Sequence, residues 1–225
     1  MNINRSIALT AIVLLIAIIY FGISDIDIEI QDYLYNFKNH SWLLNRDLEP
    51  WHTIFYSGIK KLLILIAIAF LLTLLLFWKK ESLQAYKKGL IIVIISAVTV
   101  PLSVGYLKKT TNIPCPKHYI HYGGNMPTTA VWQTYKEPYS NKSRIACWPA
   151  GHASGGFALL SLYFLFLSRR SKTTAIIAAL TVGWAMGIYK MAIGDHFFSH
   201  TVITMLLAWL ITLLVAKAVL RKKFV

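Results

Sequence analysis

Acidic residues are scarce in this 225-residue chain, where nine Asp and Glu stand against 23 Lys and Arg and give a formal net charge of +14. Charged residues of all kinds make up 14% of the chain, while hydrophobic residues make up 56%, which excludes an ordinary soluble domain. In so apolar a chain, a basic excess is typical of residues that flank membrane spans, and it argues against nucleic acid as a partner. We therefore expect an integral membrane protein.

Long apolar runs occur about six times, at 6–23, 59–78, 89–107, 154–167, 174–193 and 201–220. A helix needs about 20 apolar residues to cross roughly 30 Å of hydrocarbon, and the short fourth run can be extended toward Gly151. The middles of these runs lack ionisable side chains, which argues against a small-ion transporter, and Lys60 and Lys61 lie near one end. We predict an all-α polytopic membrane helix bundle of about six transmembrane helices, a single domain over residues 1–225.

A small-residue cleavage site is absent after the first run, because Ile23 leads almost directly into Asp25 and Asp27. We therefore interpret this run as a membrane anchor and not as a signal peptide.

Basic residues gather at one set of run ends. Twelve of the 23 lie there, opposed by Glu81 alone: Arg5, Lys79, Lys80, Lys87, Lys88, Arg169, Arg170, Lys172, Lys217, Arg221, Lys222 and Lys223. Because cytoplasmic loops carry the excess of Lys and Arg, this pattern predicts that both termini are cytoplasmic. The loops 24–58, 108–153 and 194–200 would then form the outer face. Within the first of them, aromatic residues mixed with charges predict a helix along the membrane interface, either as a cap or as a wall of a lipid entry groove.

The chain has two cysteines, Cys115 and Cys147, and both fall in the outer loop 108–153. In an oxidising compartment such as a bacterial periplasm we expect them to form a disulfide, with two unpaired thiols as the alternative. Closing a loop of about 30 residues would stabilise the fold by about 3 to 4 kcal/mol. A metal site is not expected, because we find no further cysteine or close histidine to complete a set of zinc ligands.

Three clusters on the predicted outer face combine lysine, proline, glycine and histidine. The first is Lys108, six residues and Cys115-Pro116; the second is Pro149-Ala150-Gly151-His152; the third is Tyr189-Lys190, five residues, His196, three residues and His200. In order and spacing they resemble the motifs of the type-2 phosphatidic acid phosphatase superfamily of membrane lipid phosphatases. That family has a lysine, six residues and Arg-Pro; then Pro-Ser-Gly-His; then Ser-Arg, five residues, His, three residues and Asp. Five of these positions differ here.

The resemblance implies a phosphohistidine mechanism without a cofactor or metal. His196 would be the nucleophile, and His152 would be the general acid and then the general base. The family's Asp, which holds the nucleophile, is replaced by His200, so either His200 takes that role or the neighbouring Asp195 contributes. We favour His200, because residues four apart face the same way at a helix start.

Phosphate oxygens need fixed positive charge and hydrogen-bond donors. The resemblance assigns these to Lys108, to Lys190 in place of an arginine, and to the backbone at Ala150 and Gly151. At Cys115 the family's other arginine is missing, and we expect Arg144 or Lys142, on the same loop, to compensate.

The resemblance implies a lipid phosphatase of the bacterial inner membrane with its site, within 108–200, facing the periplasm. Lipid A phosphate and undecaprenyl diphosphate are the leading substrates, followed by phosphatidate and phosphatidylglycerol phosphate. Two alternatives remain: transfer of the phosphate to another lipid, or a catalytically altered lipid-binding or transport relative. The oligomeric state is left open.

Overall fold

A computed structural model describes residues 2–140 and 144–221, and nearly all of its regular structure is helical. Lys142, Lys222 and Lys223 lie outside these residues. The α-helices are α1 (Ile3–Ile23), α2 (Ile26–Asp32), α3 (Ile59–Leu76), α4 (Lys87–Thr110), α5 (Gly151–Ala158), α6 (Arg169–Ala192) and α7 (Phe198–Arg221). The only strands of the described part are the two-residue β1 (Tyr35–Asn36) and β2 (Ser41–Trp42), which pair antiparallel. The predicted all-α membrane bundle is thus confirmed.

Five helices of the described chain are long and apolar enough to cross a membrane: α1, α3 with the π-helical turn that precedes it (His52–Gly58), α4, α6 and α7. The predicted fourth run is helical but shorter. There α5 continues into a 3-10 segment, Leu159–Phe164, and the two together rise about 24 Å. This segment packs against α4, α6 and α7 and is shorter than each of them.

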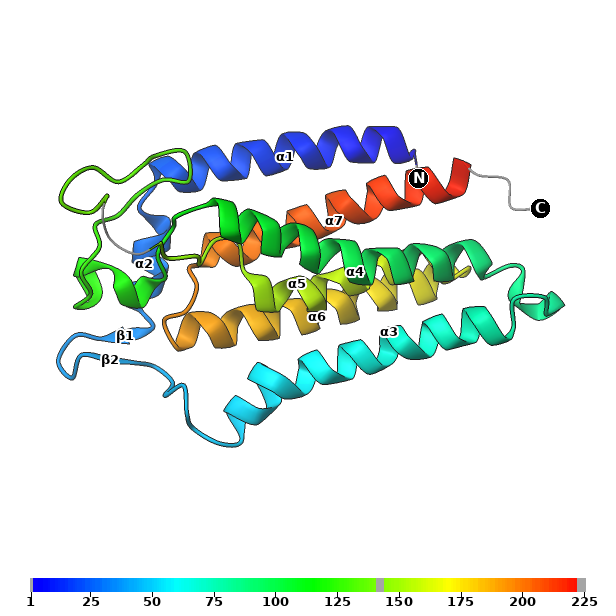
Figure 1. The fold of residues 1–225 in the computed structure, drawn as a ribbon, viewed down its shortest axis with the longest axis horizontal. Coiled ribbons are helices and arrows are strands. Elements are labelled where there is room, and N and C mark those ends of the chain that lie inside the picture. Colours follow the sequence, from blue (N-terminus) through cyan, green and yellow to red (C-terminus); the bar gives the residue numbers. More distant parts are fainter. Residues whose placement is uncertain (1, 141–143, 222–225) are drawn as a thin grey trace.

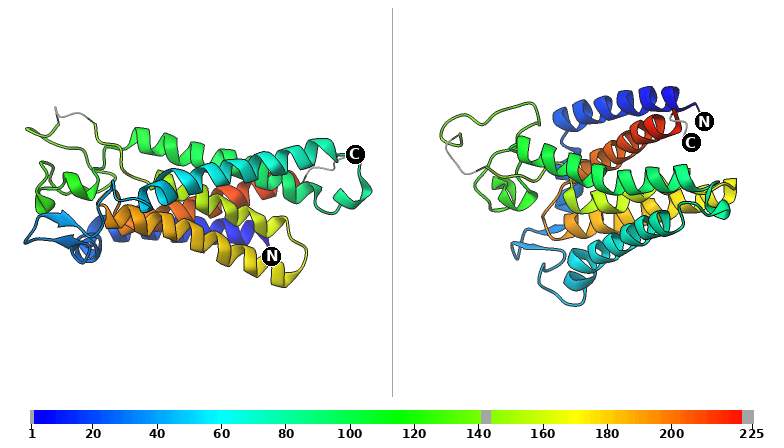
Figure 2. Two further views of the ribbon diagram at one scale, coloured as in Figure 1. Left: turned by 90° about the horizontal axis from the view of Figure 1, so that it is seen from below. Right: turned by 45° about the vertical axis from the view of Figure 1, so that its right-hand side comes forward.

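The centre of the bundle is formed by α4, α5, α6 and α7, with α1 along α7 and α3 along α4 (Figure 1). The turned views agree with this arrangement (Figure 2). Glycines allow the central helices to approach closely, because a Cβ placed on Gly156 of α5 would lie 2.7 Å from the Cα of Gly183 on α6. Side chains such as Leu62 and Leu65 of α3 are more than half exposed, as expected for a helix that faces lipid.

The helices divide the molecule into two ends. The first residues of α1 and the last residues of α7 lie at one end, and α2, the hairpin of β1 and β2, and the loop between α4 and α5 lie at the other, which we call the loop end (Figure 1). The prediction of an interfacial helix in the loop 24–58 is only partly right. Helix α2 covers seven residues, and the hairpin follows because its aromatic side chains pack inward, with Tyr35 and Trp42 against Tyr122.

Candidate active site

The turn between α6 and α7 places two histidines side by side at the loop end. Helix α6 ends at Ala192, and the backbone N–H groups of Asp195 and His196 both donate to the carbonyl of Lys190, at 2.8 and 3.2 Å. Gly194 has a φ of 72°, in the left-handed region that favours glycine. The Nδ1 atoms of His196 and His200 are 3.3 Å apart, and each residue is 2% exposed. His196 thus meets the residue that stands where the family has Asp.

Backbone contacts indicate the tautomers of this pair. The ring of His200 also hydrogen-bonds the backbone of Cys147. The N–H of Cys147 already donates to the carbonyl of Ile113, so its carbonyl is the group that accepts from His200. His200 Nδ1 is then an acceptor for His196 Nδ1–H, which leaves the lone pair of His196 on Nε2. Burial, followed by the nearby His200 and Lys108, lowers the pKa of His196 well below its usual value, so the ring is neutral.

The second motif begins α5 beside the lysine of the first. His152 is the second residue of α5, and Gly151 is the first. A Cβ placed on Gly151 would lie 3.9 Å from Lys108 Nζ, so the ammonium lies against the start of α5. Burial, followed by the charges of Lys190 and Lys108, lowers the pKa of His152 to about 4, and the charge of Asp195 opposes this shift. The structure thus brings His152, His196, Lys108 and Lys190 to one place.

Ala150 has a different role from the predicted one. Its N–H donates to Thr204 Oγ1 at 2.8 Å and to the carbonyl of His200 at 3.3 Å, and the residue is fully buried. The prediction that this N–H binds phosphate is therefore wrong, because α7 already uses it. Ala150 instead connects the second motif to the third.

Asp195 lies at the centre of a group of cations. Its carboxylate contacts Lys190 Nζ at 2.9 Å, Lys117 Nζ at 2.9 Å, and Arg46 Nη2 at 2.6 and 2.7 Å. Burial alone would raise the pKa of Asp195, but the hydrogen bonds from Arg46, Lys190 and Lys117 outweigh it and hold the pKa well below its usual range. Asp195 is therefore ionised, and it supports the site by holding cations. Its described hydrogen bonds do not include one to His196.

Arg144 does not supply the missing arginine. Its guanidinium donates to the carbonyls of Thr110 and Thr111, where α4 ends. A cation at a helix C-terminus satisfies free carbonyls and is favoured by the helix dipole. The expected compensation by Arg144 is thus wrong, and the alternative, Lys142, lies outside the described residues.

Cys115 and Cys147 form the predicted disulfide, with their Cα atoms 5.2 Å apart. His118 lies beside it, and one ligand atom from each of the three residues falls within 4.8 Å of the others. The sequence prediction overlooked His118 when it found no close histidine. Zinc binds thiolates, so the disulfide prevents these sulfurs from acting as ordinary ligands.

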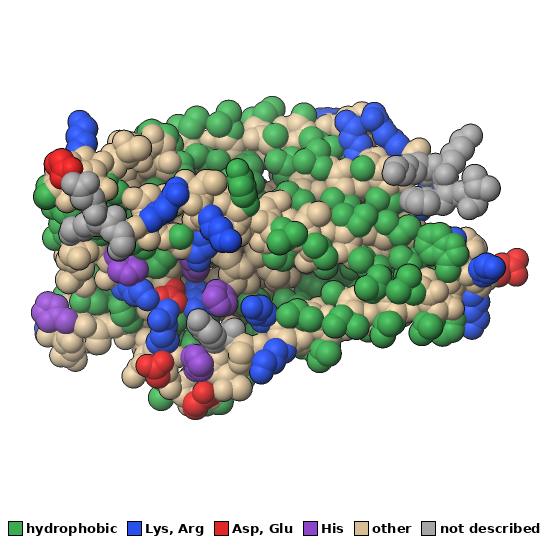
Figure 3. Space-filling view, in the orientation of Figure 1, with side chains coloured by type: hydrophobic (Ala, Val, Ile, Leu, Met, Phe, Trp, Pro, Cys, Tyr) green, Lys and Arg blue, Asp and Glu red, His purple; other side chains and the backbone are tan. Residues whose placement is uncertain are grey.

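An apolar cavity of about 450 Å³ opens between α3, α4 and α5 below the clustered charges. Lys60, Lys108 and His152 line it at the loop end, and Ser154 and Ser161 also line it. Most of the other lining side chains are apolar, among them Leu63, Ile64, Phe70, Val93, Leu159 and Met186. On the surface, Lys, Arg and His side chains gather at the loop end while apolar side chains cover the helices (Figure 3). A charged site thus adjoins an apolar space between the helices.

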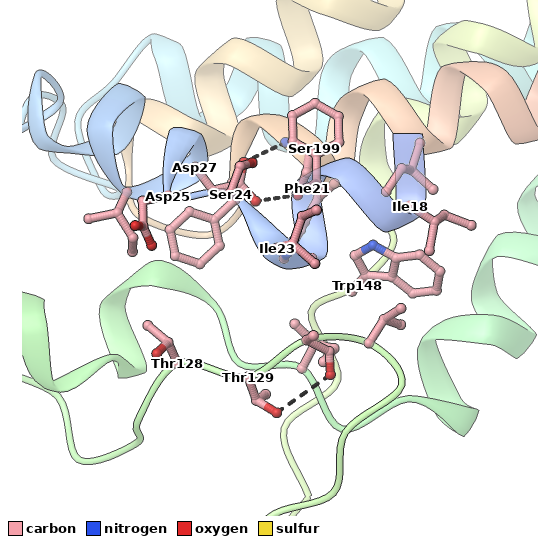
Figure 4. Close-up of a pocket in the computed structure, with 18 of the residues that line it drawn as sticks. Ile18, Phe21, Ile23, Ser24, Asp25, Asp27, Thr128, Thr129, Trp148 and Ser199 are labelled. Atoms are coloured by element: carbon pink, nitrogen blue, oxygen red, sulfur yellow. Dashed lines mark hydrogen bonds between the residues drawn. The ribbon is translucent and has the colours of Figure 1, made fainter. Parts of the chain in front are cut away.

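A second cavity, of about 200 Å³, lies between the end of α1, α2 and the loop at Thr128 and Thr129 (Figure 4). His200 lines it from the side of α7. Asp27 accepts hydrogen bonds from the backbone N–H of Ser199 at 2.8 Å and from its hydroxyl at 2.5 Å, so it caps the start of α7 next to His200.

Sequence reasoning missed Arg46, Lys117, His118 and Asp27. Lys117 could have been noticed, because it directly follows the Cys115-Pro116 pair. Arg46 had no such signal, since it lies in a loop far from any motif.

Comparison with known proteins gives two findings. The family model described as the PAP2 superfamily matches residues 89–224, which include all three motifs. A lipid A 4'-phosphatase of Francisella tularensis subsp. novicida (strain U112) is 37% identical over 73 residues, or 32% of this chain and 33% of that protein. The chain thus aligns with only a third of this relative's length. No solved structure shows a significant match.

Proposed function

Since the chain belongs to the PAP2 superfamily, a family of membrane phosphatases, we propose that it removes a phosphate group from a lipid headgroup at the loop end of the bundle. The observation that carries this proposal is the buried pair of His196 and His200, gathered with His152, Lys108 and Lys190. A neutral imidazole with its lone pair on Nε2 is what a nucleophile at phosphorus requires.

In the first step His196 Nε2 attacks phosphorus and forms a P–N bond. The bond between phosphorus and the lipid oxygen breaks, and His152, which becomes protonated when the phosphate dianion binds beside it, gives its proton to that oxygen. His200 accepts the hydrogen bond from His196 Nδ1–H and so stabilises the charge that develops on the ring. Lys108 and Lys190 neutralise the charge that spreads over the phosphate oxygens.

In the second step His152, now neutral, takes a proton from water, and the oxygen of that water attacks the phosphohistidine. The P–N bond breaks, its electron pair returns to His196 Nε2, and inorganic phosphate leaves. Each group is then back in its starting state. A second lipid hydroxyl in place of water would give phosphotransfer with the same residues.

The apolar cavity between α3, α4 and α5 supports a lipid substrate, because acyl or prenyl chains could fill it while the phosphate reaches Lys108 and His152. Lipid A phosphate and undecaprenyl diphosphate are the leading candidates, with phosphatidate and phosphatidylglycerol phosphate next. The lipid A 4'-phosphatase relative favours the first. Basic residues are concentrated at the helix ends on the side of the termini, which favours a cytoplasmic location for that side. We therefore propose that the protein lies in the bacterial inner membrane with its site facing the periplasm.

The test is phosphate release from a panel of these lipids by detergent-solubilised protein in excess EDTA. We expect turnover, an acid-labile phosphoryl adduct after rapid quenching, and loss of at least about a thousandfold in rate for His196→Asn. His40→Asn, an exposed histidine of the hairpin, is the matched control and should keep wild-type turnover. If wild-type protein binds these lipids but releases no phosphate, the altered lipid-binding relative is the better explanation.

A further inference from the structure

Two cations outside the three motifs, Arg46 and Lys117, lie on the same carboxylate as the motif residue Lys190. We propose that Arg46 and Lys117 bind the phosphate group of the substrate and replace the arginine that is missing at Cys115. This inference rests on the proposed phosphatase function and adds two residues to its binding site. Asp195 is the positioning residue that holds them.

Backbone hydrogen bonds fix both cations to the turn that carries His196. The N–H of Lys117 donates to the carbonyl of Gly194 at 3.1 Å, and the N–H of Leu44 donates to the carbonyl of Ala192 at 3.1 Å. Tyr189 Oη donates to the carbonyl of Arg46 at 3.4 Å. Two loops far apart in the sequence are thus docked at Ala192 and Gly194, on the turn that leads to the nucleophile, which positions their cations before any ligand arrives.

Packing around Gly194 holds the hairpin in the same place. Gly194 has a φ of 72°, and the indole of Trp42 lies so close to its Cα that an added Cβ would overlap the ring. Trp42 is the last residue of β2, and Arg46 follows four residues later. The aromatic contact therefore sets where the segment with Arg46 runs.

The three cations differ in how far their side chains are exposed to solvent. The side chain of Lys190 is 2% exposed, that of Lys117 is 32% exposed and that of Arg46 is 44% exposed. Asp195 brings one negative charge to three positive ones, so the group keeps a net positive charge, which favours binding of a phosphate dianion at this turn.

A family arginine at Cys115 would supply a planar, two-pronged group. Here Cys115 is bonded to Cys147, and Lys117 lies two residues further on with its charge directed at Asp195. Arg46 restores the guanidinium from a different part of the chain. Arg46 and Lys117 thus bring to the turn at Asp195 the positive charge and the guanidinium that position 115 lacks.

The experiment measures anion binding and turnover separately. Orthovanadate and inorganic phosphate are added to the full-length His196→Asn protein, and their dissociation constants are taken from the shift of the unfolding temperature. Adding Arg46→Ala or Lys117→Ala should raise the dissociation constant of each anion by about tenfold to a hundredfold, the effect expected when a charged hydrogen bond is lost. Arg46→Lys should recover part of the loss. Lys38→Ala, an exposed lysine of the hairpin, should change nothing.

In the protein with an intact His196, the same substitutions should raise KM for the lipid phosphate more than they lower kcat. Unchanged vanadate affinity in both alanine variants would overturn the inference, as would affinity that falls equally in Lys38→Ala. If wild-type protein hydrolyses no lipid phosphate but still binds vanadate through Arg46 and Lys117, the proposed function fails and the anion site stands.

Discussion

Asp195→Asn removes the negative charge that three cations contact, while it keeps the size and planar shape of the side chain. Lys190, which is 2% exposed, would then lose the carboxylate that lies 2.9 Å from its ammonium. Removing one partner of a buried ion pair costs about 3–5 kcal/mol. Arg46 and Lys117 are far more exposed, and pairs of that kind contribute about 0–1 kcal/mol each. Since the amide oxygen still accepts a hydrogen bond, we expect a loss of about 3 kcal/mol.

For a chain of this length, about 3 kcal/mol corresponds to a fall of roughly 6–12 °C in unfolding temperature. Tryptophan fluorescence in detergent can follow it, since the chain has seven tryptophans. The pKa of Asp195 is held well below its usual range, so its contribution is present above the unfolded pKa near 3.9 and is lost only as the pH falls through the folded value. The difference between wild type and variant should therefore be constant from about pH 5 to pH 8.

The matched control is Asp47→Asn, an exposed carboxylate on the same segment as Arg46, which should leave the unfolding temperature within about 1 °C. An unfolding temperature for Asp195→Asn as close to wild type as that of the control would refute the reasoning. It would mean that Lys190 is neutral or solvated in the folded protein.

Three further outcomes follow from the packing at the loop end. Peptides with Cys115 and Cys147 should be about 2 Da lighter before reduction, and reduction should cost about 3–4 kcal/mol of stability; alkylation of both cysteines in unreduced, denatured protein would contradict the bond. Burial raises the pKa of Asp27 to about 6, so its stabilising effect is full below the unfolded pKa and is lost as the pH rises through 6. Wild type should therefore lose up to about 3 kcal/mol between pH 4 and pH 7, measured by unfolding temperature, and an Asp27→Asn variant with the same slope would exclude this cause. Gly194→Ala, with its positive φ and the indole against it, should lose more than about 2 kcal/mol by the same measurement, whereas Gly105→Ala in open space on α4 should be neutral or slightly stabilising.

The sequence predicted best what depends on neighbours along the chain. His196 and His200 are four residues apart where a helix begins, so their contact follows from helix geometry alone. The apolar runs likewise predicted the five long helices, because lipid requires length and hydrophobicity. The short fourth run was harder, since α5 and the 3-10 segment after it are enclosed by other helices, where a full span is not needed.

The sequence predictions that failed concern residues whose places depend on contacts between distant segments. Arg144 shares a loop with Cys115, yet the loop directs its guanidinium to the end of α4. Arg46 is 149 residues from Asp195, and its place is set by Trp42 packing on Gly194, which no spacing in the sequence shows. The resemblance assigned the N–H of Ala150 to phosphate, but the approach of α7 satisfies it first.

The three motif segments are joined to one another in a closed ring, which explains how the site keeps its form despite changed motif residues. The disulfide joins the first segment to the second through Cys115 and Cys147. The N–H of Ala150 joins the second to the third through the carbonyl of His200, and the N–H of Lys117 joins the first to the third through Gly194. Two of these connections use backbone groups, so the altered side chains leave them intact. Preorganised charge stabilises a transition state only if it does not move as the reaction proceeds, and this ring supplies that rigidity at the turn where His196 lies.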